Sequence, residues 1–136
     1  MPRFMVFVKA SAESEAEAPP DVKMLEAMTA YNEELHRAGV LLMAEGLKPS
    51  KYGARIIFKP NGTEVVDGPF TESKEIIAGF WLLECKSYEE ALEWAKRAPN
   101  PMPGSPEAET EIRPFYEADD LAEFSPQLQE RWAVVE

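Results

Sequence analysis

Residues 76–85 read IIAGFWLLEC, and their apolar side chains fall on both of the alternating faces that an extended chain presents. A strand with one wet face alternates polar and apolar residues, whereas a strand buried on both faces is apolar almost throughout. The aromatic pair Phe80 and Trp81 also suits an extended conformation. The segment therefore predicts a strand at the centre of a β-sheet.

Three further strands of the sheet are predicted from runs of the same kind. Residues 4–8 (FMVFV) form a second apolar run, typical of another central strand. Residues 40–47 (VLLMAEGL) read as a strand that Gly46 and Pro49 end. Residues 108–114 (AETEIRP) alternate polar and apolar positions, as an edge strand does.

Two helices are predicted between these strands. The first begins near Asp21 and ends at Gly39. Its apolar face has spacings of four, three and four residues and consists of Met24, Met28, Tyr31 and Leu35. The second begins at a capping box formed by Ser87 and Glu90 and ends before Pro99.

The connections complete the predicted fold. Residues 55–59 and 63–66 flank Pro60-Asn61-Gly62, whose Asn-Gly pair is typical of a tight β-hairpin turn. Residues 11–20 (SAESEAEAPP) lack apolar periodicity and predict a mobile loop. The order strand, helix, strand, inserted hairpin, strand, helix, strand is a βαββαβ order. We therefore predict an α+β, ferredoxin-like fold with an antiparallel sheet and both helices on one face.

The apolar side chains on the second face of this sheet need a cover that the two helices do not provide. Two helices cover one face only, yet both central strands are apolar on both faces, so we expect a homodimer to cover the other. Beyond a domain of residues 1–117, residues 118–136 predict an amphipathic helical tail. Its apolar positions recur at spacings of three, four, four and three: Leu121, Phe124, Leu128, Trp132 and Val135. The pattern fits packing on the same subunit and packing on a partner equally well.

Charge and composition narrow the classes of partner. The 136 residues carry 14 Lys and Arg against 25 Asp and Glu, a net charge of -11. Such a charge repels phosphate backbones and anionic lipids, so we expect neither direct nucleic-acid binding nor a membrane partner. The apolar runs are too short for a signal peptide or a membrane span, and Cys85 is the only cysteine. These features predict a cytoplasmic protein.

A further turn is predicted at Asp67-Gly68-Pro69, and the residues around it resemble a known family. Residues 66–75 (VDGPFTESKE) followed by 77–80 (IAGF) resemble the signature of the DGPF branch of the YCII-related family. Flanking matches are AGVL at 38–41, EGLKPS at 45–50 and EIRP at 111–114. The resemblance implies a dimeric α/β barrel, in which two ferredoxin-like sheets face each other.

The resemblance covers about residues 3–117 and implies little about activity. A histidine of the first helix and a nearby aspartate have been suggested as a catalytic pair in related proteins. The chain has only His36, beside the apolar position Leu35 in the last turn of its helix, so that role is not carried over. Members are often encoded beside sigma factors, which implies a transcription-linked protein partner.

Asp67, before the Gly-Pro turn, has two interpretations. Its carboxylate accepts backbone N–H groups in an Asx-type turn. Alternatively, it lies with Glu72 and Lys74 at the mouth of the barrel and acts as a general base, with Lys74 holding it ionised or stabilising a developing negative charge. For Glu72, Lys74 and Glu75 the simpler interpretation is a solvated, mutually paired turn.

Glu45 places one carboxylate on a strand face that it shares, by alternation, with Leu41 and Met43. Such a group needs a donor or the wet end of the strand, and Arg113 is the obvious partner. Arg113 either forms this structural pair or binds the carboxylate of a ligand, with Glu45 as an orienting group. The predicted ligand-binding residues are Arg113, Glu72 and Phe70.

The sequence predicts neither a metal nor a cofactor. One histidine and one distant cysteine form no ligand cluster, and no P-loop or Rossmann glycine pattern is present. The leading hypothesis is a homodimer that binds an undetermined small molecule near the turn at 67–70. As an enzyme it would carry out cofactor-free proton transfer or lyase-type chemistry with Asp67, Lys74 and Glu45. The alternative is a non-catalytic regulatory or binding module that docks a transcription-linked partner through its tail.

Overall fold

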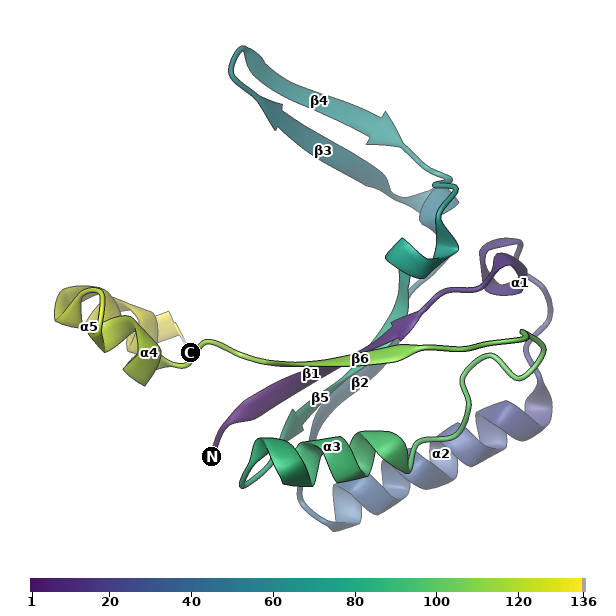
Figure 1. The fold of residues 1–136 in the computed structure, drawn as a ribbon, viewed down its shortest axis with the longest axis horizontal. Helices are drawn as coiled ribbons and strands as arrows, with labels where there is room; N and C mark the ends of the chain where they lie inside the picture. The colour runs from purple at the N-terminus through teal and green to yellow at the C-terminus, as the bar shows by residue number, and fades with distance from the viewer. Residues whose placement is uncertain (136) are drawn as a thin grey trace.

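The computed structural model describes residues 1–135 and has the predicted α+β, ferredoxin-like architecture. Its four-stranded sheet has the order β2-β5-β1-β6, with every neighbouring pair antiparallel. The strands are β1 (Arg3–Lys9), β2 (Leu41–Gly46), β5 (Ile77–Glu84) and β6 (Thr110–Pro114). The helices α2 (Val22–Arg37) and α3 (Tyr88–Lys96) lie together on one side of this sheet (Figure 1).

Helix α2 forms where the sequence predicts it. The side chain of Asp21 caps it by accepting hydrogen bonds from the backbone N–H groups of Lys23 and Met24, at 2.8 and 3.2 Å. Tyr31 and Leu35 are buried against the sheet. Gly39, with φ +75°, supplies the left-handed conformation that ends the helix.

Helix α3 also begins at its predicted residue, because the Ser87 hydroxyl accepts from the N–H of Glu90 at 3.2 Å. The core between both helices and the sheet is apolar and includes Phe4, Val6, Tyr31, Leu35, Trp81, Leu83, Cys85 and Ala91. Burying a side chain such as Leu35 stabilises the fold by about 1.5–3 kcal/mol. Cys85 is fully buried in this core, and its burial raises the pKa of the thiol to about 11.

The second face of the sheet has no helix on it among the described residues. In β1 and β5 the buried side chains alternate with half-buried ones, and those that face away from the helices are Met5, Phe7, Phe80 and Leu82. We call this surface the open face. Both central strands are therefore apolar on both sides, as predicted, while α2 and α3 cover one side only.

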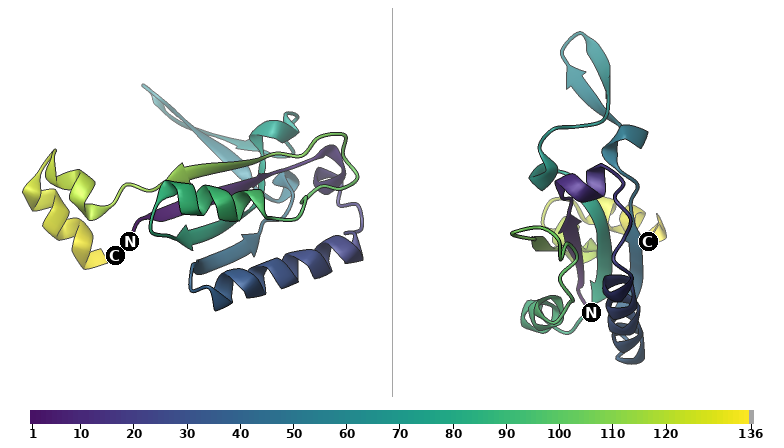
Figure 2. Two further views of the ribbon diagram at one scale, coloured as in Figure 1. Left: turned by 60° about the horizontal axis from the view of Figure 1, so that its bottom comes forward. Right: turned by 90° about the vertical axis from the view of Figure 1, so that its right-hand side faces the viewer.

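The inserted hairpin is confirmed as β3 (Ala54–Lys59) and β4 (Gly62–Asp67). It forms its own two-stranded sheet, and Figures 1 and 2 show it projecting away from the four-stranded sheet. Its turn depends on Gly62, whose φ of +134° few other residues adopt.

The prediction of a loop without regular structure over 11–20 was wrong at its start. Residues 12–15 form a short helix, α1 (Ala12–Glu15), because Ser11 and Ser14 exchange hydrogen bonds in a capping box. Ser-x-x-Ser satisfies helix-terminal N–H groups as Ser-x-x-Glu does, and it was not recognised in the sequence.

Residues 67–70, called the DGPF turn below, pack against the short helix η1 (Ser50–Tyr52). The N–H of Phe70 donates to the Ser50 hydroxyl at 3.0 Å, and the N–H of Gly68 donates to the carbonyl of Gly53 at 3.0 Å. A Cβ at position 68 would lie 1.9 Å from the carbonyl oxygen of Ser50. Only glycine lets the backbone at position 68 lie this close to the backbone of Ser50, so the turn packs tightly against η1.

The tail consists of α4 (Ala118–Ala122) and α5 (Pro126–Val135), which pack on each other. Figures 1 and 2 show both standing clear of the sheet and of α2 and α3. Glu117 holds the start of the tail to β1 through an ion pair with Arg3 at 3.0 Å. Packing on the helices of the same subunit, one of the two predicted alternatives, does not occur. Across residues 1–135, every helix is too short or too polar to cross a membrane.

Replacing Gly68 by alanine tests the contact between the DGPF turn and η1. Because the added methyl group would overlap backbone atoms, we expect Gly68→Ala to lower the free energy of unfolding by about 2–3 kcal/mol. The control is Gly104→Ala, since a Cβ there meets nothing within 4 Å, and its effect should stay within about 0.5 kcal/mol. Urea unfolding followed by circular dichroism measures both. Equal stability of the two variants would contradict the contact.

Candidate functional site

A pocket of about 520 Å³ lies beside the DGPF turn, between the segment after β2 and the start of β5. Its walls combine apolar, aromatic and charged side chains. The residues that line it include Leu47, Lys48, Tyr52, Arg55, Phe70, Glu75 and Ile77. Phe70 is the only one of the six predicted site residues that lines this pocket.

Two cations of this pocket lie over aromatic rings. The Arg55 guanidinium lies 3.8 Å from the centre of the Phe70 ring, and the Lys48 ammonium lies 5.4 Å from that of Tyr52. Neither cation forms an ion pair with a carboxylate of residues 1–135. Arg55 therefore keeps its charge available in this pocket, while Lys48 also lies near enough to Glu17 to contribute to the lowered pKa of that carboxyl.

Helix η1 forms one wall of the pocket, and two carboxylates from the segment after β1 bind to it. Glu15 accepts from both the N–H and the hydroxyl of Ser50, which is buried. Glu17 pairs with Lys51 and accepts from the Tyr52 hydroxyl at 3.1 Å. The hydrogen bond from Lys51 lowers the pKa of Glu17, and the same bond raises the pKa of Lys51. Residues 15 and 17 thus act as a strap across η1.

The predicted group of Asp67, Glu72 and Lys74 does not come together within one protomer. Asp67 is the exposed last residue of β4, and its carboxylate makes no hydrogen bond or ion pair with the described residues, so the Asx-type turn is not formed. Lys74 instead lies 4.0 Å from Glu107, with both side chains largely exposed. Glu72 precedes the short helix η2 (Ser73–Glu75) and is exposed.

The predicted pair of Glu45 and Arg113 was wrong. Glu45 lies on β2 and Arg113 on β6, the two opposite edges of the sheet, which are about 14 Å apart across β5 and β1. Arg113 instead pairs with Glu111 at 3.4 Å. A hydrogen bond from Lys9, reinforced by Arg113, lowers the pKa of Glu111.

Alternation placed Glu45 correctly beside Met43 but wrongly beside Leu41, and a β-bulge explains the difference. The pairing of β2 with β5 shifts register between Leu41 and Met43. Leu41 and Ala44 therefore pack against the core, while Met43 and Glu45 are exposed. A strict period of two does not survive an extra residue.

A second cavity, of about 310 Å³, lies between α2 and the sheet. Its walls include Met24, Met28, Met102 and Trp81, and its floor includes Gly46 and Gly79. The indole N–H of Trp81 donates to the amide oxygen of Asn32 at 2.7 Å, so the one amide on this wall is already engaged. Glu45, a predicted site residue, also lines this cavity and is its one charged side chain, so the cavity offers mostly apolar contact beside a single carboxylate.

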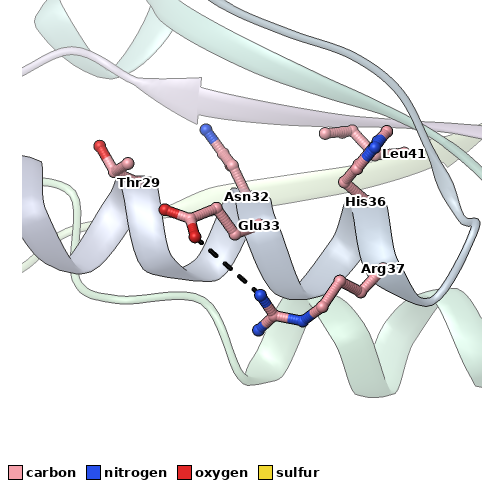
Figure 3. A pocket seen from close by; sticks show the side chains of 6 residues that line it. All are labelled: Thr29, Asn32, Glu33, His36, Arg37 and Leu41. Carbon is pink, nitrogen blue, oxygen red and sulfur yellow. Dashed lines mark ion pairs between the residues drawn. The ribbon is translucent and has the colours of Figure 1, made fainter.

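A third hollow, of about 420 Å³, runs along α2 and is drawn in Figure 3. His36 lies there beside Leu41, and Glu33 and Arg37 approach to 4.0 Å on the neighbouring turn. All three charged or titratable side chains are exposed to solvent. Within residues 1–135, no three His, Cys, Asp or Glu side chains are grouped as a metal site.

The cations Lys48 and Arg55 were missed in the sequence as site residues. One signal was available: residues 46–63 contain four Lys and Arg and no Asp or Glu, in a chain of net charge -11. The aromatic partners Tyr52 and Phe70 come from different segments, so their stacking on these cations depends on the folded turn.

Comparisons with known proteins identify relatives along most of the chain. The family model of the YCII-related domain matches residues 3–116. An uncharacterised protein of Rhizobium meliloti is 33% identical over 95 residues, which cover 70% of this chain and 75% of that protein.

A solved structure also resembles the chain, at 15% sequence identity and a TM-score of 0.46. It is 5-chloro-2-hydroxyhydroquinone dehydrochlorinase from Burkholderia phenoliruptrix in complex with 2,5-dihydroxybenzoquinone, and the match covers 85% of this chain and 94% of that one. Because the family model spans nearly the whole ferredoxin-like unit, the chain belongs to the YCII-related domain family.

Proposed function

We propose that this protein is a homodimer that binds a small anionic molecule with an apolar or aromatic body in the pocket beside the DGPF turn. The observation that carries the proposal is the placement of Lys48 and Arg55 over aromatic rings in a pocket of about 520 Å³. A pocket of this size accommodates a metabolite of one or two rings.

Electrostatics favour an anion at this place. The chain as a whole is strongly acidic, so it repels anions everywhere except where cations are concentrated. Arg55 presents a planar fork that suits a carboxylate or a similar oxyanion, and Lys48 adds a second point charge. Glu75 also lines the pocket and gives an acceptor for a donor group on the ligand.

Binding is the part of the expected function that the geometry supports best. An acid–base reaction by Asp67, Lys74 and Glu45 needs these groups at one substrate, and they lie in three different places of the protomer. A catalytic role for them would require a second copy to bring them together. A regulatory module would use the same pocket as its sensor, so ligand binding is common to both functions that the sequence suggests.

The surface area supports the homodimer. The accessible surface is 9569 Å², whereas a compact monomer of 15.3 kDa exposes about 7,100 Å². The difference of about 2,400 Å² per chain falls in the range that permanent dimers bury on each partner. The open face is the central apolar part of this surplus, because Met5, Phe7, Phe80 and Leu82 lie on it side by side.

Anion binding can be tested with a pair of dyes. 8-Anilinonaphthalene-1-sulfonate carries a sulfonate, and N-phenyl-1-naphthylamine is its uncharged analogue. We expect Arg55→Gln to weaken binding of the charged dye by about tenfold, because a charge-assisted contact is lost. Binding of the uncharged dye should be unchanged, and fluorescence titration measures both.

The matched control for this test is Lys59→Gln, a cation of the same strand that is already paired with Glu64. This variant should leave the affinity for the charged dye within about twofold. An Arg55→Gln protein that binds the charged dye as tightly as the Lys59→Gln protein would contradict the proposed site.

The dimer can be tested by placing a charge on the open face. We expect the wild-type protein to sediment at twice the chain mass of 15.3 kDa, and Leu82→Glu to sediment as a folded monomer, since an unpaired charge would be buried between the copies. Met43→Glu, at the exposed edge of the same face, is a second variant that leaves the core untouched.

Val22→Glu is the control, because Val22 is exposed on α2 and remote from the open face. Its protein should remain dimeric. A wild-type monomer at micromolar concentration would refute the dimer without bearing on the dye experiment.

A further inference from the structure

Two arms of this chain leave the body of the molecule. The hairpin arm consists of residues 54–67, and the tail consists of residues 117–135. Figure 1 shows both arms clear of the four-stranded sheet. Each arm carries an apolar face that residues 1–135 of the same chain leave open to solvent.

The hairpin arm is amphipathic. In its register Ile56 pairs with Val65 and Phe58 follows on the same face, and these side chains are 57, 63 and 81% exposed. The opposite face carries the ion pair between Lys59 and Glu64. A two-stranded hairpin is marginally stable by itself, so the apolar face requires a cover.

The tail also exposes apolar side chains to solvent. Phe124, in the turn between α4 and α5, and Leu128, in α5, both belong to the predicted apolar face and are 75 and 47% exposed. Helices α4 and α5 pack on each other and not on α2 or α3. Apolar residues of this size at the end of a short helical pair gain about 1.5–3 kcal/mol each when they are fully buried.

The tail is acidic, and the cations of the hairpin arm are gathered on β3. This strand carries Arg55 and Lys59, while Glu64 and Asp67 lie on β4 and make the hairpin arm neutral as a whole. Residues 117–130 of the tail carry five Asp and Glu and no Lys or Arg. Complementary potentials of this kind direct the pairing of surfaces and exclude like-with-like contacts.

Within one chain the arms start at opposite ends of the sheet. The hairpin arm joins β2 and β5 at the end where Gly46 pairs with Gly79, whereas the tail follows Pro114, which pairs with Phe4 at the other end. These ends are about 20–25 Å apart along the strands. In a dimer whose open faces meet with their strands antiparallel, the hairpin end of one copy lies beside the tail end of the other.

We propose that the tail of each copy packs its apolar face onto the apolar face of the hairpin arm of a second copy, so that two equal exchanges clamp the dimer. Acidic side chains of the tail then lie at the free edge of β3, where the long side chain of Lys59 reaches them from the other face. This inference rests on the homodimer proposed above and adds the place where the copies hold each other. The surplus surface of about 2,400 Å² is large enough to include both arms.

A zero-length cross-link between copies tests the clamp. Equal amounts of ¹⁴N-labelled and ¹⁵N-labelled full-length protein are mixed, equilibrated and treated with a carbodiimide, which joins a lysine to a carboxylate in direct contact. We expect mixed-isotope peptides that join Lys59 to Glu117, Asp119, Asp120 or Glu123. Lys59→Arg keeps the charge but removes the reactive amine, so it should abolish the Lys59 products and leave the dimer intact.

The outcomes separate the clamp from the dimer. A sedimenting dimer that gives no mixed hairpin–tail peptides, or gives them within single chains only, overturns the clamp and leaves the dimer standing. Mixed peptides that join two hairpin arms also overturn it. A monomer overturns both proposals.

A double-mutant cycle on the dimer dissociation constant gives a second test. Phe58→Ser and Leu128→Ser should each raise this constant at least about tenfold, because each removes the same buried contact. The double variant should weaken the dimer by clearly less than the product of the two single effects. Ile57→Ser, on the other face of the hairpin arm, is the control and should change little. Independent, multiplicative effects of Phe58 and Leu128 would overturn the contact.

Discussion

The apolar pairs Met5 with Leu82 and Phe7 with Phe80 lie side by side on the sheet face that helices α2 and α3 leave uncovered. The same two strands bury Phe4, Val6, Trp81 and Leu83 on their other face. No arrangement of two helices hides both faces of one sheet, so the composition of the central strands demands a cover from outside the ferredoxin-like unit. The proposed dimer and the proposed clamp both start from this imbalance.

Most of the fold was predictable from local patterns. The four sheet strands, helices α2 and α3 and the hairpin each have a strong periodic or turn signal, and all were confirmed within a few residues. Helix α1 was missed because its capping serines lie in an acidic segment without an apolar stripe. Leu41 was wrongly placed on the face of Met43 and Glu45 because the bulge after Leu41 leaves no mark in the sequence.

The candidate site was much less predictable than the fold. Patterns along the chain suggested Asp67, Lys74 and Glu72 because they are close in sequence, yet a hairpin and a short helix direct them apart. Arg55 and Phe70 are fifteen positions apart in the sequence. The Arg55 guanidinium lies over the Phe70 ring because the DGPF turn folds back on η1. A contact of this kind is set by the way the turn packs in the folded protein. It does not follow from the separation of two residues along the chain, so a single sequence does not reveal it.

The strap formed by Glu15 and Glu17 ties the first residues of the chain to one wall of the pocket. The free energy that couples the strap to this wall acts in both directions. The strap stabilises the ordered wall, and an occupant that orders the wall stabilises the strap by the same amount. An occupant that orders this wall would therefore slow the opening of residues 12–17, and their amide protons would exchange with solvent more slowly. This segment would then report occupancy of the pocket, although none of its residues lines the pocket.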